Sequence, residues 1–414
     1  MKLPATIATT CAGLLLTCSM VSAAETLAEV FTEGTVRGEL RYLYFDRDFD
    51  GKTKDWADSA AGTLLYYNTA ELFGLSAGVG YASSNDIGSD DDKNVYGLLA
   101  RNSNGSHDSY SRFQEYFLQG NWFDTKIKIG AQEIETPFLQ RHDIRMTPKT
   151  YRGLTIENNS IENLTLQALY ITDYMSWNDD DFQNMDSISA EKGADDNPLF
   201  AGSLKYTLPF ESSILTTELW HYYMEDYFKW NYARVNFMKD VGEIRLQITP
   251  SFLSQKSDGK DYIGHLDSTQ YGFSTGARAY GFDLTLFYTR TDDDPVFAPW
   301  GDSKVMIQQI LASGRADENA YGARLIYDFG RLGIDGLSTY IFYGYYDVDH
   351  DSKTYADVNE TDFNIQYNFS GFLKGFSVRG RYAIVDYDGG TADDLNDFRI
   401  YLRYAFSFGG NKDA

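Results

Sequence analysis

Arginine is the residue type in this 414-residue chain that points most directly to a chemistry. A guanidinium group binds a carboxylate through two parallel hydrogen bonds. Nine arginines occupy alternate positions in segments whose other alternate positions are apolar: Arg37, Arg41, Arg245, Arg278, Arg324, Arg379, Arg381, Arg399 and Arg403. Such a set predicts a track for carboxylate-bearing solutes. The plainer alternative is a set of ion pairs that hold a protein wall together.

A second group of candidates lies in residues 133–152, where the alternation is interrupted. Apolar side chains such as Phe138 and Leu139 stand there beside several charged ones. The charged residues that we assign to the solute path are Arg141, Asp143, Arg145 and Arg152. A loop folded into a water-filled interior satisfies both demands, because its apolar side rests on the wall and its cations face the water. The alternative is an outer loop that packs on its neighbours.

Acidic residues near position 300 complete the candidate path. Asp293, Asp294 and Asp302 flank residues 295–300, which are apolar enough to fold inward as well. Opposed rows of acids and arginines would orient zwitterions in a pore. The other Asp-rich segments lack the spacing of an EF-hand loop. We expect them to be solvated loops, with divalent cations bridging them to anionic lipid as an alternative, and we predict no bound metal and no cofactor.

The element that must carry the arginines is clearest at the end of the chain, in residues 396–408. One set of alternate positions is apolar, with aromatics towards the ends: Phe398, Ile400, Leu402, Tyr404, Phe406 and Phe408. The other set contains Arg399 and Arg403. Side chains alternate between the faces of a strand, so this stretch has the pattern of a strand that stands in a bilayer between aromatic girdles.

The same alternation predicts about 18 strands. We place them at residues 35–49, 59–69, 75–83, 112–122, 126–132, 151–157, 164–172, 198–207, 213–223, 227–237, 243–253, 270–280, 282–290, 321–329, 337–348, 361–369, 376–388 and 396–408. Short turns follow the even strands and nearly all long, acidic connections follow the odd ones, apart from a short link near Glu225. Outer-membrane barrels have this arrangement of short periplasmic turns and long outer loops. Residues 85–108 are predicted to be one of the surface loops.

The first 24 residues have the features of a secretory signal peptide. Lys2 is followed by an apolar stretch and by small residues suited to cleavage. Both cysteines, Cys11 and Cys18, lie in this segment, so the mature chain has no thiol and no disulfide. Thr17 makes Cys18 a poor lipidation site. The predicted organisation is a signal peptide at residues 1–24 and a single barrel domain at residues 25–414.

Composition excludes several classes of protein. The net charge is −24, which disfavours nucleic-acid binding because phosphates are repelled. The mean hydropathy is −0.40, and after the signal no apolar run reaches the roughly 20 residues of a membrane helix. Tyrosine (32) and phenylalanine (27) are abundant, which fits aromatic girdles. The five histidines form no catalytic motif, so we predict no enzymatic activity and keep a barrel hydrolase as a minor alternative.

The predicted fold class is therefore all-β, a closed transmembrane antiparallel barrel of about 18 strands with loops folded into it. Closure is required because unpaired strand edges are costly in lipid. A barrel of this size encloses a lumen wide enough for water.

Three stretches resemble the OprD family of bacterial outer-membrane porins. The first, residues 130–158, is similar to the strand, constriction loop and next strand of that family. The matching positions are Asp143, Arg145, Pro148, Thr150, Tyr151 and Gly153. Residues 299–330 resemble the family's seventh loop and following strand, and the start GTVRGELRYLYFDRDF resembles its first strand.

The resemblance implies an 18-stranded channel, a monomer or loose homotrimer, in the outer membrane of a Gram-negative bacterium. It also implies a lumen ladder of arginines, with Arg141, Arg145 and Arg152 in the matching region. The expected function is passive diffusion of small hydrophilic solutes, such as amino acids and other carboxylates. The expected partners are those solutes and ions, outer-membrane lipid and lipopolysaccharide, and the barrel-assembly machinery through the last strand. The alternative is an adhesin or structural barrel that acts through its acidic loops.

Overall fold

The structure is a computed structural model that describes residues 24–90, 95–102, 106–189, 196–301, 305–348, 356–389 and 392–409. The expected signal peptide lies outside these ranges except for Ala24, and so does Asp302. No helix in the described ranges has the length and apolar character needed to cross a bilayer.

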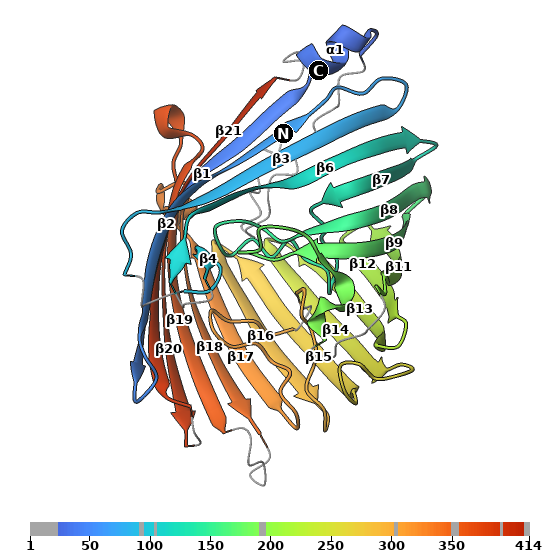
Figure 1. The fold of residues 1–414 in the computed structure, drawn as a ribbon. Coiled ribbons are helices and arrows are strands. Elements are labelled where there is room, and N and C mark those ends of the chain that lie inside the picture. The colour runs from blue at the N-terminus through green and yellow to red at the C-terminus, as the bar shows by residue number, and fades with distance from the viewer. Residues whose placement is uncertain are drawn as a thin grey trace.

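Eighteen long strands form one sheet (Figure 1). They are β1 (Thr35–Asp50), β2 (Trp56–Asn68), β3 (Leu75–Asp86), β6 (Tyr110–Trp122), β7 (Thr125–Gln132), β8 (Thr150–Ile161), β9 (Leu164–Met175), β11 (Leu199–Phe210), β12 (Ser213–Met224), β13 (Phe228–Val241), β14 (Ile244–Ser257), β15 (Asp267–Ala279), β16 (Phe282–Thr291), β17 (Asn319–Asp328), β18 (Leu337–Asp347), β19 (Asp357–Asn368), β20 (Phe376–Asp388) and β21 (Asp394–Gly409). The prediction of about 18 strands is confirmed.

A short helix, short strands and 3-10 turns lie outside the eighteen long strands. They are α1 (Leu27–Thr32), β4 (Ala100–Arg101), β5 (His107–Asp108), β10 (Gln183–Asn184), and the 3-10 turns η1 (Met185–Ile188), η2 (Phe329–Leu332) and η3 (Gly371–Leu373). Helix α1 begins with a capping box in which the Thr26 hydroxyl accepts from the Glu29 N–H. It lies at the rim where β1 begins and β21 ends (Figure 1).

The sheet closes on itself. Each long strand pairs antiparallel with the next, and β1 pairs with β21 from Thr35 opposite Gly409 to Asp50 opposite Asp394. No edge of the wall is therefore left unpaired, as a bilayer requires. The tight turns lie at one end: Phe123 and Asp124, for example, join β6 to β7 with φ of 50° and 55°, which is the left-handed geometry of a two-residue hairpin.

Alternation sorts the side chains as predicted. On β21, Phe398 and Tyr404 are about 40% exposed on the outer face, whereas Arg399 is 2% exposed and lies against loop residues inside. On β1, Leu40 is exposed outside while Leu43 is buried inside. The apolar face thus meets lipid and the arginine face meets the lumen.

Three long connections fold inward between strands and occupy the interior (Figure 1). They follow β3, β7 and β16, and we call the latter two loop A (residues 133–149) and loop B (residues 292–318). The prediction that residues 85–108 form a surface loop is wrong in part. Val95, Leu98 and Leu99 are buried against Leu43 and Met146, because this short apolar stretch packs on the inner face of β1 and on loop A.

Candidate constriction and solute path

Loop A is held against the wall by its apolar side. Phe138 is 1% exposed, and its ring centroid lies 5.5 to 5.8 Å from those of Tyr222, Trp230 and Tyr232. Burying an aromatic side chain contributes about 1.5–3 kcal/mol, and edge-on aromatic pairs add to that. Phe138 therefore fixes loop A to β12 and β13.

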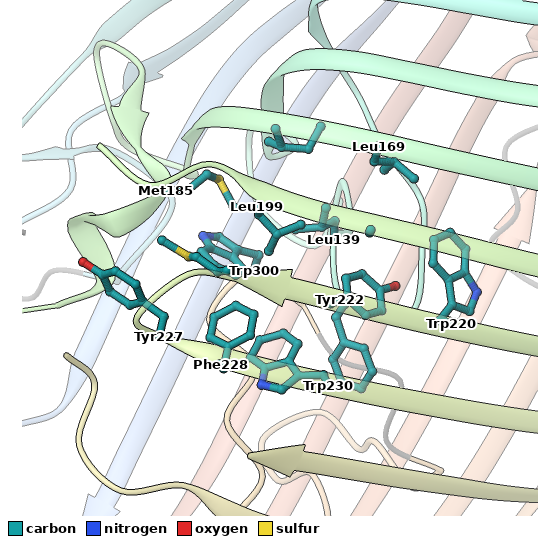
Figure 2. Close-up of a cluster of buried hydrophobic side chains, with 14 of the residues drawn as sticks. Leu139, Leu169, Met185, Leu199, Trp220, Tyr222, Tyr227, Phe228, Trp230 and Trp300 are labelled. Carbon is teal, nitrogen blue, oxygen red and sulfur yellow. The ribbon is translucent and has the colours of Figure 1, made fainter. Parts of the chain in front are cut away.

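The same aromatic cluster also holds loop B. Figure 2 shows Trp300 from loop B and Leu139 from loop A among the side chains of Tyr222, Phe228 and Trp230. Phe228 and Trp230 stack with ring centroids 3.9 Å apart. Side chains therefore fill the lumen beside β12 and β13, and the open part of the lumen lies towards the rest of the wall.

Tyr151 joins the two loops. Its hydroxyl, on the inner face of β8, lies 2.9 Å from the carbonyl oxygens of both Gln140 and Trp300, and it accepts a hydrogen bond from the Gln140 N–H. Lys149 Nζ donates to the Pro299 carbonyl at 3.2 Å. The constriction is therefore one connected unit of loop A, loop B and β8.

Carboxylates on β19 and β21 fix the far side of loop B. Glu360 accepts the backbone N–H groups of Ile310 and Leu311 at 2.8 and 2.7 Å. Asp362 accepts the Gln309 N–H, and the Gln309 side chain donates to Asp397 at 2.6 Å. These buried acids accept hydrogen bonds from loop B, so they hold the loop in place across the lumen.

Asp143 fixes the charged side of loop A. Arg41 on β1 donates two hydrogen bonds to its carboxylate, at 2.5 and 2.8 Å, and a third to the Met146 carbonyl. Arg141 and Arg403 lie 3.4 and 3.8 Å from the same carboxylate. Burial alone would raise the pKa of Asp143, but the charges of Arg41, Arg403 and Arg141 hold it well below its usual range.

This lowered pKa predicts how the constriction responds to acid. A depressed carboxyl pKa gives stability that is complete above the ordinary value of about 3.9 and is lost as the pH falls below it. Open-channel noise in planar bilayers should therefore stay constant from roughly pH 8 to 5 and rise below about pH 3.5. Asp143→Asn should be noisy at every pH with no acid-dependent increase. A rise that begins near pH 6 in the unaltered protein would contradict this assignment.

Inward-facing arginines follow one another down the neighbouring strands β20, β21 and β1. Arg399 is opposite Arg381, and Arg403 is opposite Arg41. Successive inner positions on a strand are roughly 7 Å apart. From Arg47 to Arg37 on β1 the set covers ten residues, or about 34 Å, which is the thickness of a bilayer core.

Several of these arginines are neutralised by carboxylates. Arg399 and Arg47 donate to Asp397 at 2.5 and 2.7 Å, and Arg41 also donates to Glu39. Arg141 lies 2.6 Å from Glu133. These pairs support the plainer interpretation for these residues, since their charges already have partners.

Three arginines differ, because no carboxylate lies within 4 Å of them in the described residues. Arg145 donates to the Tyr96 carbonyl and rests on the Phe45 ring, and Arg379 donates to Asn364. Arg381 Nε has no hydrogen bond within the described chain. Burial and the charge of Arg399 lower the pKa of Arg145 to about 9, which still leaves it protonated at neutral pH.

Tyr401 lies at the centre of this group. Its ring is 5.8 Å from the guanidinium of Arg379 and also meets Phe45 edge-on. The charges of Arg381 and Arg145 act on it as well. Arg145, Arg379 and Arg381 therefore surround one buried phenol with positive charge that no carboxylate of the described residues pairs within 4 Å, and we call them the Tyr401 arginines.

Other predicted residues lie apart from this group. Arg37 stacks on Tyr66 at 4.2 Å. Arg324 on β17 lies over the rings of Phe287 and Phe342, and its Nε has no hydrogen bond within the described chain.

The assignment of Arg152 to the solute path is corrected. Tyr151 reaches the loops inside the barrel, so its neighbour Arg152 must project from the outer face of β8. There Arg152 donates to Asp173 at 2.9 and 2.7 Å and lies over the Phe182 ring.

The assignment of an acidic wall to Asp293 and Asp294 is also corrected. Asp294 accepts the Asp267 N–H at the start of β15, and Asp293 is exposed beside it at the rim. Neither forms an ion pair with an arginine among the described residues, and Asp302 lies outside them. The acids that meet the lumen arginines are Glu39, Glu133, Asp143 and Asp397, and the charge of Asp362 acts on Arg381.

Some of these residues were missed in the sequence. Asp397 and Tyr401 stand two positions from Arg399 and so share its face, and Glu360 and Asp362 alternate in the same way on β19. The alternation of side chains along each strand would have identified them as lumen residues. Elsewhere, no three His, Cys, Asp or Glu side chains of the described chain come together as a metal site.

Comparisons with known proteins agree with this fold. A search of curated protein sequences found no match. Three solved porins have TM-scores of 0.81. Pseudomonas aeruginosa OpdK, solved with vanillate, is 22% identical, and the match covers 91% of this chain and 99% of that one. P. aeruginosa OccK9 (OpdG) is 25% identical, with coverage of 92% and 100%. Acinetobacter baumannii OccAB3 is 20% identical, with coverage of 91% and 100%.

The family comparison covers nearly the whole barrel. Residues 29–408 match the family described as outer membrane porin, OprD family. This chain belongs to the OprD family of porins and is a β-barrel channel of the bacterial outer membrane.

Proposed function

We propose that this porin admits small hydrophilic solutes by passive diffusion and prefers those that carry a carboxylate. The observation that carries the proposal is the group of Tyr401 arginines, whose charges have no carboxylate partner among the described residues. A solute carboxylate supplies the missing negative charge through hydrogen bonds to guanidinium. The structure of OpdK with vanillate, itself a carboxylate, supports this solute class by analogy.

The path runs along the inner face of β20, β21 and β1. Arg399, Arg403 and Arg41, whose charges are paired, and Arg37, which stacks on Tyr66, lie along this face and guide an anion past the Tyr401 arginines. The aromatic cluster beside β12 and β13 closes the other side of the lumen. We assign Arg324 a supporting role from β17, as a cation that faces the lumen outside this path.

The remaining assignments belong to the same proposal. Residues 1–24 act as a signal peptide and residues 25–414 form one barrel domain, with no catalytic activity. The last strand is recognised by the barrel-assembly machinery, and the barrel works as a monomer or in a loose homotrimer.

Reconstitution tests the function. Purified protein in planar bilayers should give discrete conductance steps, and vanillate or an acidic amino acid should block the current. In liposome swelling, such carboxylates should enter several times faster than uncharged sugars of similar size. Absence of discrete steps would refute the channel, and equal entry rates for charged and uncharged solutes would refute the preference.

A further inference from the structure

The outer face of β11 to β14 carries a feature that transport does not explain. A groove of about 440 Å³ crosses these strands. Its floor is formed by Gly202 and Ala233, whose small size leaves the backbone uncovered, and its sides are formed by Leu204, Leu219 and Phe252. A Cβ added to Gly202 would meet only the Gln167 carbonyl, at 3.8 Å, so the groove is open space above a well-formed sheet.

The groove faces lipid. Trp220 and Tyr222 point into the aromatic cluster inside the barrel, so Leu219 and His221, which alternate with them, project outward. Leu204, Leu219 and Phe252 are 37–46% exposed on that face. The membrane is the environment of this surface, and the molecules beside it are lipids.

One end of the groove is polar. His221 and Asn231 are directly opposite each other on β12 and β13, and the His221 Nδ1 lies 2.9 Å from the Asn231 Oδ1. This bond leaves the ring Nε2 and the Asn231 amide N–H groups without another hydrogen bond in the described chain. An ionisable side chain that faces the membrane is costly and marks a functional site.

The depth of His221 and Asn231 in the bilayer determines which part of a lipid lies beside them. His221 is three residues from the end of β12 at Met224, roughly 10 Å along the strand from the rim. That rim carries the longer connections, as on the extracellular side of outer-membrane barrels. The pair thus lies near the boundary between head groups and acyl chains of the outer leaflet.

Two lysines lie one row nearer to the rim. Lys229 is opposite Tyr223 and Lys256, and both ammonium groups are at least half exposed. Lys229 pairs with Asp258, and Lys256 with Asp267 at 3.4 Å. Exposed ion pairs of this kind are weak, so an anionic head group can compete for the lysines.

We propose that this groove binds the lipid A part of lipopolysaccharide. One acyl chain lies over Ala233 between Leu219 and Phe252, the polar linkage of that chain bonds to His221 and Asn231 beside Gly202, and a phosphate meets Lys229 and Lys256. Along the outer positions of β13, Ala233, Asn231 and Lys229 follow one another towards the rim, and this matches the order of acyl chain, polar linkage and phosphate in a phosphorylated glycolipid. We call this site the lipid A groove.

Titration of the delipidated full-length barrel with bis-phosphorylated hexa-acyl lipid A tests the proposal, with native mass spectrometry as the readout. We expect one lipid per barrel. Gly202→Phe should fill the groove and weaken binding at least ten-fold. Lys229→Gln/Lys256→Gln should weaken it several-fold, and removal of both phosphates from the lipid should weaken binding to the unaltered protein by the same factor.

Ala323→Phe is the matched control, since Ala323 is an exposed small residue on the outer face of β17 at a similar depth. It should bind lipid A as the unaltered protein does. The heat-induced gel shift of folded barrels and unchanged conductance verify that each variant folds. Full lipid A binding by Gly202→Phe would overturn the proposal. Equal binding of phosphatidylglycerol would overturn it, as would a dimer of barrels that Gly202→Phe dissociates.

Discussion

If the proposed function is right, we expect the double variant Arg379→Gln/Arg381→Gln to weaken the block of the current by vanillate at least ten-fold. Neither arginine has a carboxylate partner in the described residues, so their positive charge is available to a solute. A hydrogen bond to a charged group contributes about 1.5–3 kcal/mol, and about 1.4 kcal/mol corresponds to a factor of ten in affinity. The measurement is the block of single-channel current as a function of vanillate concentration.

The matched control removes two lumen arginines elsewhere. Arg245 and Arg278 are opposite each other on β14 and β15 near the tight turns, and Arg245 is paired with Asp240. Arg245→Gln/Arg278→Gln changes the net charge equally and should leave block within two-fold of the unaltered channel. An equal loss of block in both double variants would show that net charge, rather than the Tyr401 arginines, governs binding.

The second large effect concerns the position of loop A. Arg41→Ala leaves Asp143 as a buried carboxylate without its bidentate partner, and such a change costs about 3–5 kcal/mol. Loop A should then leave the wall at β1, so that conductance rises about two-fold or more and the open channel becomes noisy. The temperature at which the barrel unfolds in detergent should fall as well.

Replacing both partners of the ion pair with neutral side chains of similar size separates the effect of an unpaired charge from that of lost side-chain volume. Arg41→Gln/Asp143→Asn has no unpaired buried charge, so it should be quieter and more stable than Arg41→Ala. Arg234→Ala breaks an ion pair with Glu218 that holds neither loop, and its conductance should be unchanged. If Arg41→Ala has the conductance and noise of the unaltered protein, Arg41 does not hold the constriction.

The strands could be predicted because their signal is local. Inner and outer residues alternate along β1 and β21, and each strand shows this pattern without its neighbours. The lumen arginines on β20 and β21 followed from the same rule. Arg152 did not, because it was grouped with the charged residues of the interrupted stretch 133–152, whereas it lies on β8 directly after the inward-facing Tyr151.

Contacts inside the barrel could not be predicted, because they join distant parts of the chain. Arg41 and Asp143 are 102 residues apart, and Tyr151 and Trp300 are 149 apart. Local composition also misled in one segment, where acidic neighbours concealed the buried Leu98 and Leu99. The inward folding of loops A and B was predicted from their mixed composition, but their partners were not.

The pairing of β1 with β21 has a consequence for biogenesis. Arg41 is on the first strand and Arg403 on the last, and the two become neighbours only when the chain ends meet. The proposed solute track is therefore incomplete in every intermediate in which the first and last strands have not yet paired. A truncated product that inserts into the membrane would pass solutes without selection, so the barrel gains its proposed preference only in the closing step of assembly.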